Sequence, residues 1–179
     1  MLSKNQNRTY EVEPYNPAWV GRFEDIKKLL QSVFGEQALS IEHVGSTSVP
    51  GMSAKPVIDV LVVVEEMSAF SVEKEAMVKA GYEWDADYIA PATLIFYKLE
   101  KGGDRKIENI HVCPAGSASV SQFLDIRDFL RAHSEWAKKY ALIKETLVLK
   151  FHNDYISYRE GKQDFLHQLL LLAKEWKKI

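Results

Sequence analysis

Cysteine is almost absent from the sequence, because Cys113 is the single cysteine among 179 residues. One cysteine excludes an internal disulfide and any metal site built from several thiolates. The net charge is only -2, which disfavours a uniformly basic nucleic-acid-binding protein but leaves room for a local basic pocket. The longest apolar run near the C-terminus, at 169–173, is far too short to cross a bilayer. The polar N-terminal stretch, 1–15, lacks the apolar core of a signal peptide, so we expect a cytoplasmic protein without a membrane partner.

The sequence does contain the composition of a folded domain. Hydrophobic residues make up 46% and charged residues 27%, as in soluble globular proteins. The length suits a single domain over 1–179. Strand-like segments occur up to about 115, and helical periodicity dominates from about 119 to 179. We therefore predict an α/β (α+β) protein with a mixed β-sheet flanked by helices, followed by a C-terminal group of about three helices.

The predicted elements follow from periodicity and from turn residues. One helix begins at Pro17 after the capping residue Asn16 and ends at Gly35. Residues 93–100 and 106–114 are expected to pair as a hairpin through two glycines. The remaining predictions are strands over 9–15, 38–45 and 56–66, a helix from Ser68 or Ser71 to Gly81, and C-terminal helices that divide at 133–134 and 153–154.

Asp59 is the most informative residue of the strand predicted over 56–66. The other residues around it are β-branched or apolar on both faces, which is typical of a central strand. An unpaired buried carboxylate is costly, so this position favours a pocket, a metal or a cationic partner. The alternative is that Asp59 only caps backbone N–H groups of a tight strand–loop connection.

The loop before this strand has the residue types of a phosphate site. Gly45 follows a predicted strand and allows the backbone to approach a ligand closely. Ser46, Thr47 and Ser48 add hydroxyl and N–H groups that suit phosphate oxygens. The loop has neither a Walker ending nor the GxGxxG fingerprint. Lys55, just beyond the loop, can reach a phosphate as a point charge.

The segment HVGSTSVPGMSAKPVIDVLV resembles the signature of the GrpB-like family, a divergent branch of the nucleotidyltransferase superfamily. The resemblance extends over nearly the whole chain, through EPYNPAWVGRFEDI, NIHVCPAGS, FLDIRDFLRAHSEWAKKYALIKETL and YISYREGKQDFLHQLL. It implies a nucleotidyltransferase-like sheet that binds a nucleotide or another phosphorylated small molecule. Nucleic-acid binding, as in some polymerases of this superfamily, is disfavoured by the slightly acidic charge balance and by the lack of a stripe of aromatic and basic residues. Two functions follow: transfer of a nucleotidyl group to a small acceptor, or non-catalytic binding, since such domains also occur appended to dephospho-coenzyme A kinase.

The sequence departs from the superfamily at its metal site. Active members hold two metals with two carboxylates two residues apart on one strand and a third carboxylate on a later strand. Asp59 fills the first position, but Leu61 stands at the second and we place His111 at the third. The resemblance then implies one divalent ion, Mg²⁺, held by Asp59 with help from substrate phosphates, with His111 as a catalytic base. A cluster of Asp59, His43 and His111 that binds Zn²⁺ or Mn²⁺ is the alternative.

On three successive helices of the helical half, a basic side chain lies four residues after an arginine or a tyrosine. The pairs are Arg127 with Arg131, Tyr140 with Lys144, and Tyr158 with Lys162. A solvated helix face with internal pairs, such as Asp128 with Arg131, is the simpler explanation. Repetition at positions that match the family motifs favours a site instead, so we predict a cationic wall of Arg127, Lys144 and Lys55 opposite Asp59. Arg131 and Lys162 are further predicted phosphate-binding residues, and His43 and Tyr140 are predicted to line the pocket.

Overall fold

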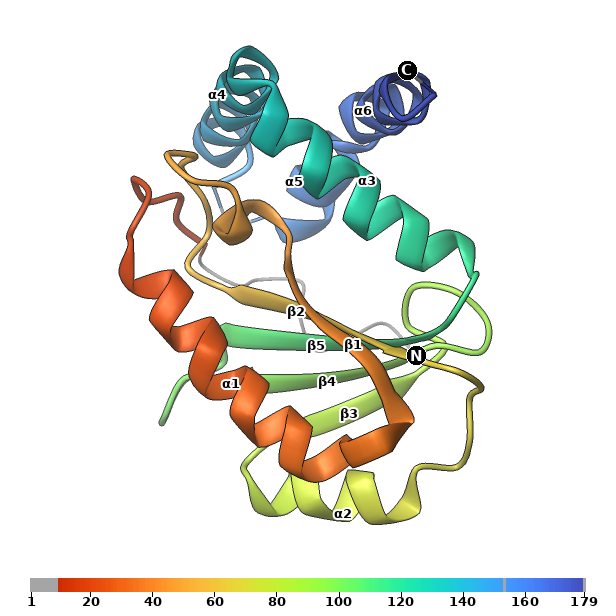
Figure 1. Ribbon diagram of the computed structural model, residues 1–179. Coiled ribbons are helices and arrows are strands. Elements are labelled where there is room, and N and C mark those ends of the chain that lie inside the picture. The colour runs from red at the N-terminus through yellow and green to blue at the C-terminus, as the bar shows by residue number, and fades with distance from the viewer. Residues whose placement is uncertain (1–9, 153, 179) are drawn as a thin grey trace.

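A mixed five-stranded sheet divides the molecule into two helical layers (Figure 1). The computed structural model describes residues 10–152 and 154–178. The strand order is β1 (Ala38–Val44), β2 (Ile58–Val64), β5 (Lys106–Pro114), β4 (Leu94–Leu99) and β3 (Glu83–Ala86). β2 and β5 are parallel, and the other neighbours are antiparallel. β2 is therefore an interior strand, as its apolar run predicts.

One face of the sheet packs against α1 (Ala18–Phe34) and α2 (Ser71–Lys79) (Figure 1). Side chains alternate between faces along a strand, so Ile58, Val60 and Val62 of β2 all enter this core. α1 supplies Trp19 and Leu30, which are almost fully buried. Short 3-10 turns over Gly35–Gln37 and Ser46–Ser48 lead into and out of β1.

The other face of the sheet carries the C-terminal helices (Figure 1): α3 (Ala118–Ala132), α4 (Ser134–Lys150), α5 (Tyr155–Glu160) and α6 (Gln163–Trp176). Leu61, Val63 and Cys113 form a small apolar cluster under α3. Val49 and Met52, from the loop between β1 and β2, are buried among α3, α4 and α6. This loop therefore joins the sheet to the helical layer.

Several predicted elements are confirmed and one is wrong. β4 and β5 form the predicted hairpin, and the chain breaks between α3 and α4 at His133. The strand predicted over 9–15 is wrong for the part that is described, since Glu13 makes only an isolated bridge to Ala54. Thr9, at its start, and Asn153, at a predicted helix boundary, lie outside the described residues.

Two further elements differ from the sequence analysis. β3 is an edge strand that was not predicted from the sequence. Its four residues alternate between charged and apolar, but the stretch is short and all four are exposed, so the signal for a strand is weak. The last predicted helix divides into α5 and α6 around Gly161. A Cβ at Gly161 would lie 2.6 Å from Leu147 Cδ2, so α4 packs closely against this turn. Within the described ranges, no helix is both long and apolar enough to cross a bilayer.

Candidate functional site

Asp59 forms the centre of a polar site on the sheet face that carries the C-terminal helices. It lies in β2 opposite Val44, the last residue of β1. Gly45 follows with a φ of +70°, and a Cβ there would lie 2.6 Å from Asp59 Oδ2. The Ser48 hydroxyl donates to the Gly45 carbonyl over 2.6 Å, which closes the turn. The group that lies against the Gly45 backbone is thus the Asp59 carboxylate, whereas the sequence suggested a ligand there.

Asn109 and His111 complete the polar face beside Asp59. They lie two residues apart on β5, so they point to the same side, and Asn109 is the direct partner of Asp59 in the parallel register. Asn109 Nδ2 donates to Asp59 Oδ1 over 2.8 Å, and His111 Nε2 lies 3.8 Å from the same oxygen. The sequence analysis found His111 but missed Asn109. Its place two residues before His111 was the available signal.

The Asp59 carboxylate is kept ionised by its neighbours. Burial by itself raises its pKa, but the interactions with His111, Asn109 and Lys55 outweigh burial and hold the pKa below its ordinary value. The side chain is still 28% exposed. Asp59 is therefore a negative charge that a ligand can reach from solvent.

Three buried polar atoms around β5 lack a hydrogen-bond partner in the described part of the chain: Asn109 Oδ1, His111 Nδ1 and Ser117 Oγ. The His111 ring packs against Phe123 of α3, with 4.8 Å between ring centroids. Buried polar atoms without partners are costly in a folded protein. A ligand or ordered water beside β5 would satisfy the two that flank Asp59.

The residues around Asp59 do not fit a resident two-metal centre. Leu61, on the same face as Asp59, is fully buried in the apolar cluster with Val63 and Cys113. Asn109, not an acid, stands across from Asp59. Across the described residues, no three His, Cys, Asp or Glu side chains are placed to hold one metal ion. Asp59 supplies the single carboxylate.

His43 does not join this site, so the alternative metal cluster of Asp59, His43 and His111 is wrong. His43 pairs with Val60, whose side chain enters the α1 core on the opposite face of the sheet. Its ring stacks on Phe23 with 4.8 Å between centroids, and Nε2 lies 3.0 Å from Thr47 Oγ1. Burial lowers its pKa to about 4; nearby arginines act in the same direction and Asp59 opposes them.

Lysines from the loop and the C-terminal helices do approach Asp59. Lys55 Nζ lies 4.6 Å from the ring centre of Tyr155, and its charge lowers the pKa of Asp59. Lys162 Nζ lies 4.5 Å from the ring centre of Tyr158. Burial, then the charge of Lys55, lower the pKa of Lys162 to about 8, while Asp59 opposes them. Lys55 and Lys162 are thus two cations that repel each other beside one carboxylate.

Lys144 and Tyr140 line the same region from α4. Lys144 is only 2% exposed, and its Nζ donates to the Ser53 carbonyl over 2.6 Å. Burial, then the charge of Lys162, lower its pKa to about 7. Burial and the charge of Asp59 raise the pKa of Tyr140, whereas Ser46 lowers it. Lys144 therefore holds the loop through a buried hydrogen bond, and Tyr140 interacts with both Ser46 and Asp59.

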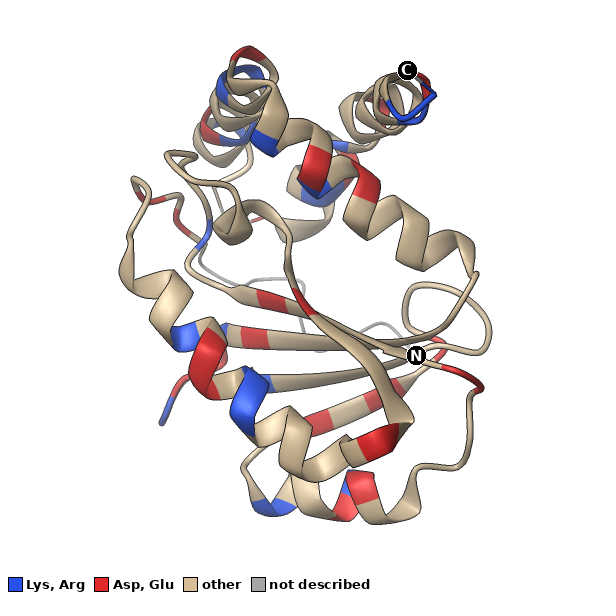
Figure 2. Ribbon diagram, in the orientation of Figure 1, with Lys and Arg blue, Asp and Glu red and all other residues tan. Residues whose placement is uncertain are grey.

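Arg127 is already neutralised by two carboxylates. Its Nη1 donates to Glu42 Oε2 and its Nε to Asp128 Oδ1, each over 2.8 Å. Burial alone would lower its pKa, but these two acids raise it above the ordinary value. Figure 2 shows this mixture of charge, with acidic positions on β1 and β2 beneath both signs on the C-terminal helices. Of the predicted wall, Lys55 and Lys144 lie near Lys162, whereas Arg127 ties α3 to β1.

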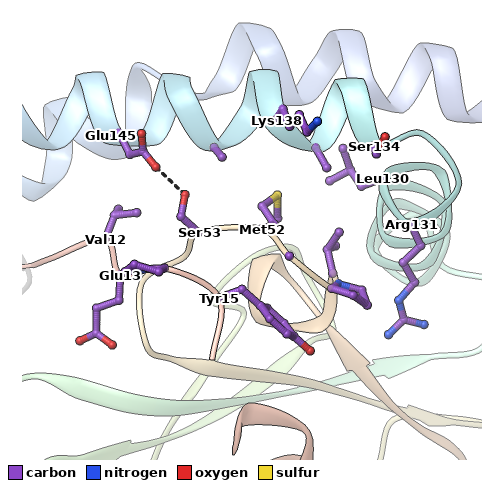
Figure 3. Close-up of a pocket in the computed structure, with 16 residues that line it drawn as sticks. Val12, Glu13, Tyr15, Met52, Ser53, Leu130, Arg131, Ser134, Lys138 and Glu145 are labelled. Atoms are coloured by element: carbon purple, nitrogen blue, oxygen red, sulfur yellow. Dashed lines mark hydrogen bonds between the residues drawn. The ribbon is translucent and has the colours of Figure 1, made fainter. Parts of the chain in front are cut away.

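Arg131 faces a different part of the molecule. Its Nε donates to the Ser48 carbonyl over 2.9 Å. It lines a cleft of about 870 Å³ between the segment 12–15, the loop 49–53, α3 and α4 (Figure 3). Neither Asp59 nor Lys162 lines this cleft. Lys55 does not line this cleft either, so the structure separates Arg131 from Lys55 and Lys162, two of the other predicted phosphate-binding residues.

Comparison with known proteins supports the fold and the family. The family model described as GrpB protein matches residues 9–171. The UPF0157 protein YqkA of Bacillus subtilis (strain 168) is 34% identical over 171 residues, which cover 96% of this chain and 49% of YqkA. This chain therefore spans about half the length of that relative.

Two solved structures resemble the chain. A crystal structure of the conserved protein GrpB from Enterococcus faecalis has a TM-score of 0.85 and 28% identity, covering 93% of this chain and 99% of that one. The structure of Cid1 in complex with its short product ApU has a TM-score of 0.52 and 12% identity, covering 84% of this chain and 48% of Cid1. The second likeness shows a shared nucleotidyltransferase-like fold and no more.

Proposed function

This chain belongs to the GrpB family, and we propose that it binds a nucleoside triphosphate or another phosphorylated small molecule beside Asp59. The observation that carries this proposal is the pair Lys55 and Lys162, whose charges interact with each other and with Asp59. Within residues 10–152 and 154–178, Lys162 forms no ion pair. A polyanion between the two lysines would relieve their mutual repulsion.

The hydroxyl residues of the loop have two different roles: Thr47 and Ser48 maintain its conformation, and Ser46 is available to a ligand. The Thr47 hydroxyl donates to the Val57 carbonyl over 3.2 Å, and the Ser48 hydroxyl donates to Gly45, so both maintain the turn. Ser46 instead faces Tyr140. We therefore assign phosphate contacts to Lys55, Lys162 and Ser46, with Lys144 holding the loop in place from beneath.

A divalent cation enters this proposal as part of the ligand. Mg²⁺ commonly binds through one or two protein carboxylates together with substrate phosphates. Asp59 provides one such carboxylate, and Leu61 provides none. We propose that Mg²⁺ arrives with the triphosphate and that Asp59 supplies one oxygen to it. The binding itself rests on the two lysines.

Nucleotidyl transfer to a small acceptor is the second candidate, and the contact between His111 and Asp59 favours it. A neutral imidazole beside a carboxylate can accept the proton of an attacking hydroxyl while the carboxylate stabilises the charged ring. His111 Nε2 lies 3.8 Å from Asp59 Oδ1, and its Nδ1 has no partner in the described part of the protein. The missing second carboxylate makes binding without turnover the better-supported function.

Calorimetric titration of each nucleoside triphosphate with Mg²⁺ tests the binding function. We expect Lys162→Ala to weaken binding at least about tenfold, since a charge-assisted contact is lost. Lys174→Ala is the matched control, because Lys174 is an exposed lysine on α6. No binding of any triphosphate, or equal affinity in the Lys162 variant, would refute the site.

Pyrophosphate release distinguishes the two functions. Each triphosphate is incubated with Mg²⁺ and a panel of hydroxyl and phosphate acceptors. Binding without release supports the accessory role. Release that Asp59→Asn and His111→Gln both abolish supports transfer.

A further inference from the structure

The cleft that Arg131 lines is separate from the Asp59 site. It has a volume of about 870 Å³, enough for a small organic ligand. Its walls are the N-terminal segment 12–15, the loop 49–53, and the facing sides of α3 and α4 (Figure 3). Ser46 and Lys55, at the two ends of the same loop, are not part of its lining.

The walls of the cleft are fixed rather than loosely placed. Ser53 is held twice by α4: its carbonyl accepts from Lys144 Nζ, and its hydroxyl donates to Glu145 Oε1, each over 2.6 Å. Glu13 and Ala54 exchange two backbone hydrogen bonds of 2.9 Å, which anchor the N-terminal segment against the loop. The cavity is therefore preformed, which reduces the entropy cost of binding.

Most of the lining is apolar. Val49, Met52, Leu130 and Ala137 are each less than 7% exposed and belong to one hydrophobic cluster. Pro14 and Pro50 add further apolar surface. Such a wall favours a ligand with a hydrocarbon or aromatic body.

Charge is unevenly distributed along the cleft. Figure 3 shows Arg131 at one end and Glu13 and Glu145 at the other. Arg131 Nε is occupied by the Ser48 carbonyl, but neither Nη group has an acceptor in the described part of the chain. The hydroxyl end of Tyr15 points toward the same end in Figure 3. An anion is therefore favoured at Arg131 and repelled at the opposite end.

We propose that this cleft is a second small-molecule site, which binds an amphipathic anion with its apolar body against Val49, Met52 and Leu130. The carboxylate or phosphate of the ligand accepts hydrogen bonds from the free Nη groups of Arg131 and from the Tyr15 hydroxyl. A guanidinium held through Nε presents its outer edge in a fixed direction, which suits a planar or tetrahedral oxyanion. This site is independent of the function proposed for Asp59.

A fluorescent probe pair tests the proposal. 8-Anilino-1-naphthalenesulfonate has an aromatic body and an anionic group, and N-phenyl-1-naphthylamine lacks the anion. We expect Arg131→Gln to weaken binding of the sulfonate about tenfold and to leave binding of the neutral probe unchanged. Arg131→Lys keeps the charge but removes the planar guanidinium that can donate two hydrogen bonds, so the loss of affinity for the sulfonate should be intermediate. Lys139→Gln is the control, because this exposed α4 residue does not line the cleft.

A second variant and a competition complete the test. Ala141 lines the cleft on α4, so Ala141→Phe should fill it and remove binding of both probes. Octanoate and octyl phosphate should each displace the sulfonate, and their relative strength tells whether a carboxylate or a phosphate is preferred. Circular dichroism of each variant checks the fold. Sulfonate binding that survives both Arg131→Gln and Ala141→Phe, or that neither competitor displaces, overturns the proposal.

Discussion

Gly45 and Asp59 are in such close contact that any side chain at position 45 would force the Asp59 side chain to move. A Cβ added to Gly45 would lie 2.6 Å from Asp59 Oδ2 and 3.1 Å from Asp59 Cβ. The φ of Gly45, +70°, is also one that residues with a side chain rarely adopt. The absence of a side chain at Gly45 thus allows the Asp59 carboxylate to pack directly against the loop backbone.

Gly45→Ala should therefore destabilise the protein more than the same substitution at a glycine that also has a positive φ but no close neighbour. Gly51 has a φ of +77° and nothing within 4 Å of its added Cβ. We expect Gly51→Ala to lower the free energy of unfolding by about 1 kcal/mol and Gly45→Ala by at least about 3 kcal/mol. Urea denaturation measures both, and equal losses would contradict the Gly45–Asp59 contact.

Leu61 stands where active nucleotidyltransferases have a second metal-binding carboxylate. Leu61→Asp tests whether restoring that carboxylate is enough for the site to bind a metal ion. Leu61 is fully buried, so an unpaired carboxylate there should cost about 3–5 kcal/mol in stability. Mg²⁺ should recover part of this loss, because Asp59 and residue 61 would then share one strand face. Leu61→Asn is the neutral control. Thermal unfolding with and without Mg²⁺ should show stabilisation of Leu61→Asp alone, and an equal effect on both variants would exclude a latent metal position.

His43 should make stability depend on pH below neutrality. Its pKa is about 4 in the folded protein against an ordinary value of 6.5, so the unfolded chain binds the extra proton first. The stabilisation from neutral His43 is complete above 6.5 and is lost as the pH falls towards 4, by at most about 1.4 kcal/mol per pH unit. His43→Phe keeps a ring against Phe23 and should remove this slope. His167→Gln, at an exposed α6 position, should retain the slope.

Lys144 should make the stability of the fold depend on pH above neutrality. Its pKa is about 7 in the folded protein and 10.5 ordinarily, so the unfolded chain holds its proton to higher pH. Stability should therefore rise between these two values, by at most about 1.4 kcal/mol per pH unit. Lys144→Met should flatten this rise and, by leaving the Ser53 carbonyl unpaired, cost about 1–3 kcal/mol. Denaturation curves at several pH values measure both, and an unchanged slope would contradict the buried lysine.

Strand periodicity was sufficient to place Asp59 and the apolar strand around it, because side-chain direction alternates along one strand. The same alternation directs His111 away from its neighbours Ile110 and Val112, which enter the α1 core. Asn109 was missed because its position opposite Asp59 depends on the register between two strands that are distant in the sequence.

The arginines show a second limit of prediction from the sequence. Helical spacing places Arg127 and Arg131 on adjacent turns, but their partners come from β1 and from the loop after it. Arg127 is neutralised by Glu42, 85 residues away in the sequence. Arg131 is held by Ser48 and lines another cavity. Spacing within one helix carries no information about such contacts, whereas most of the helices and strands followed from patterns local to each element.

We propose above that phosphates bind between Lys55 and Lys162 beside Asp59. A crystal structure of the chain with Mg²⁺ and a non-hydrolysable nucleoside triphosphate tests it most directly. We expect phosphate oxygens within hydrogen-bonding distance of both lysine ammonium groups, and the metal on Asp59. Phosphates bound only at the Arg131 cleft, or an Asp59 face without ligand at saturating triphosphate, would contradict it.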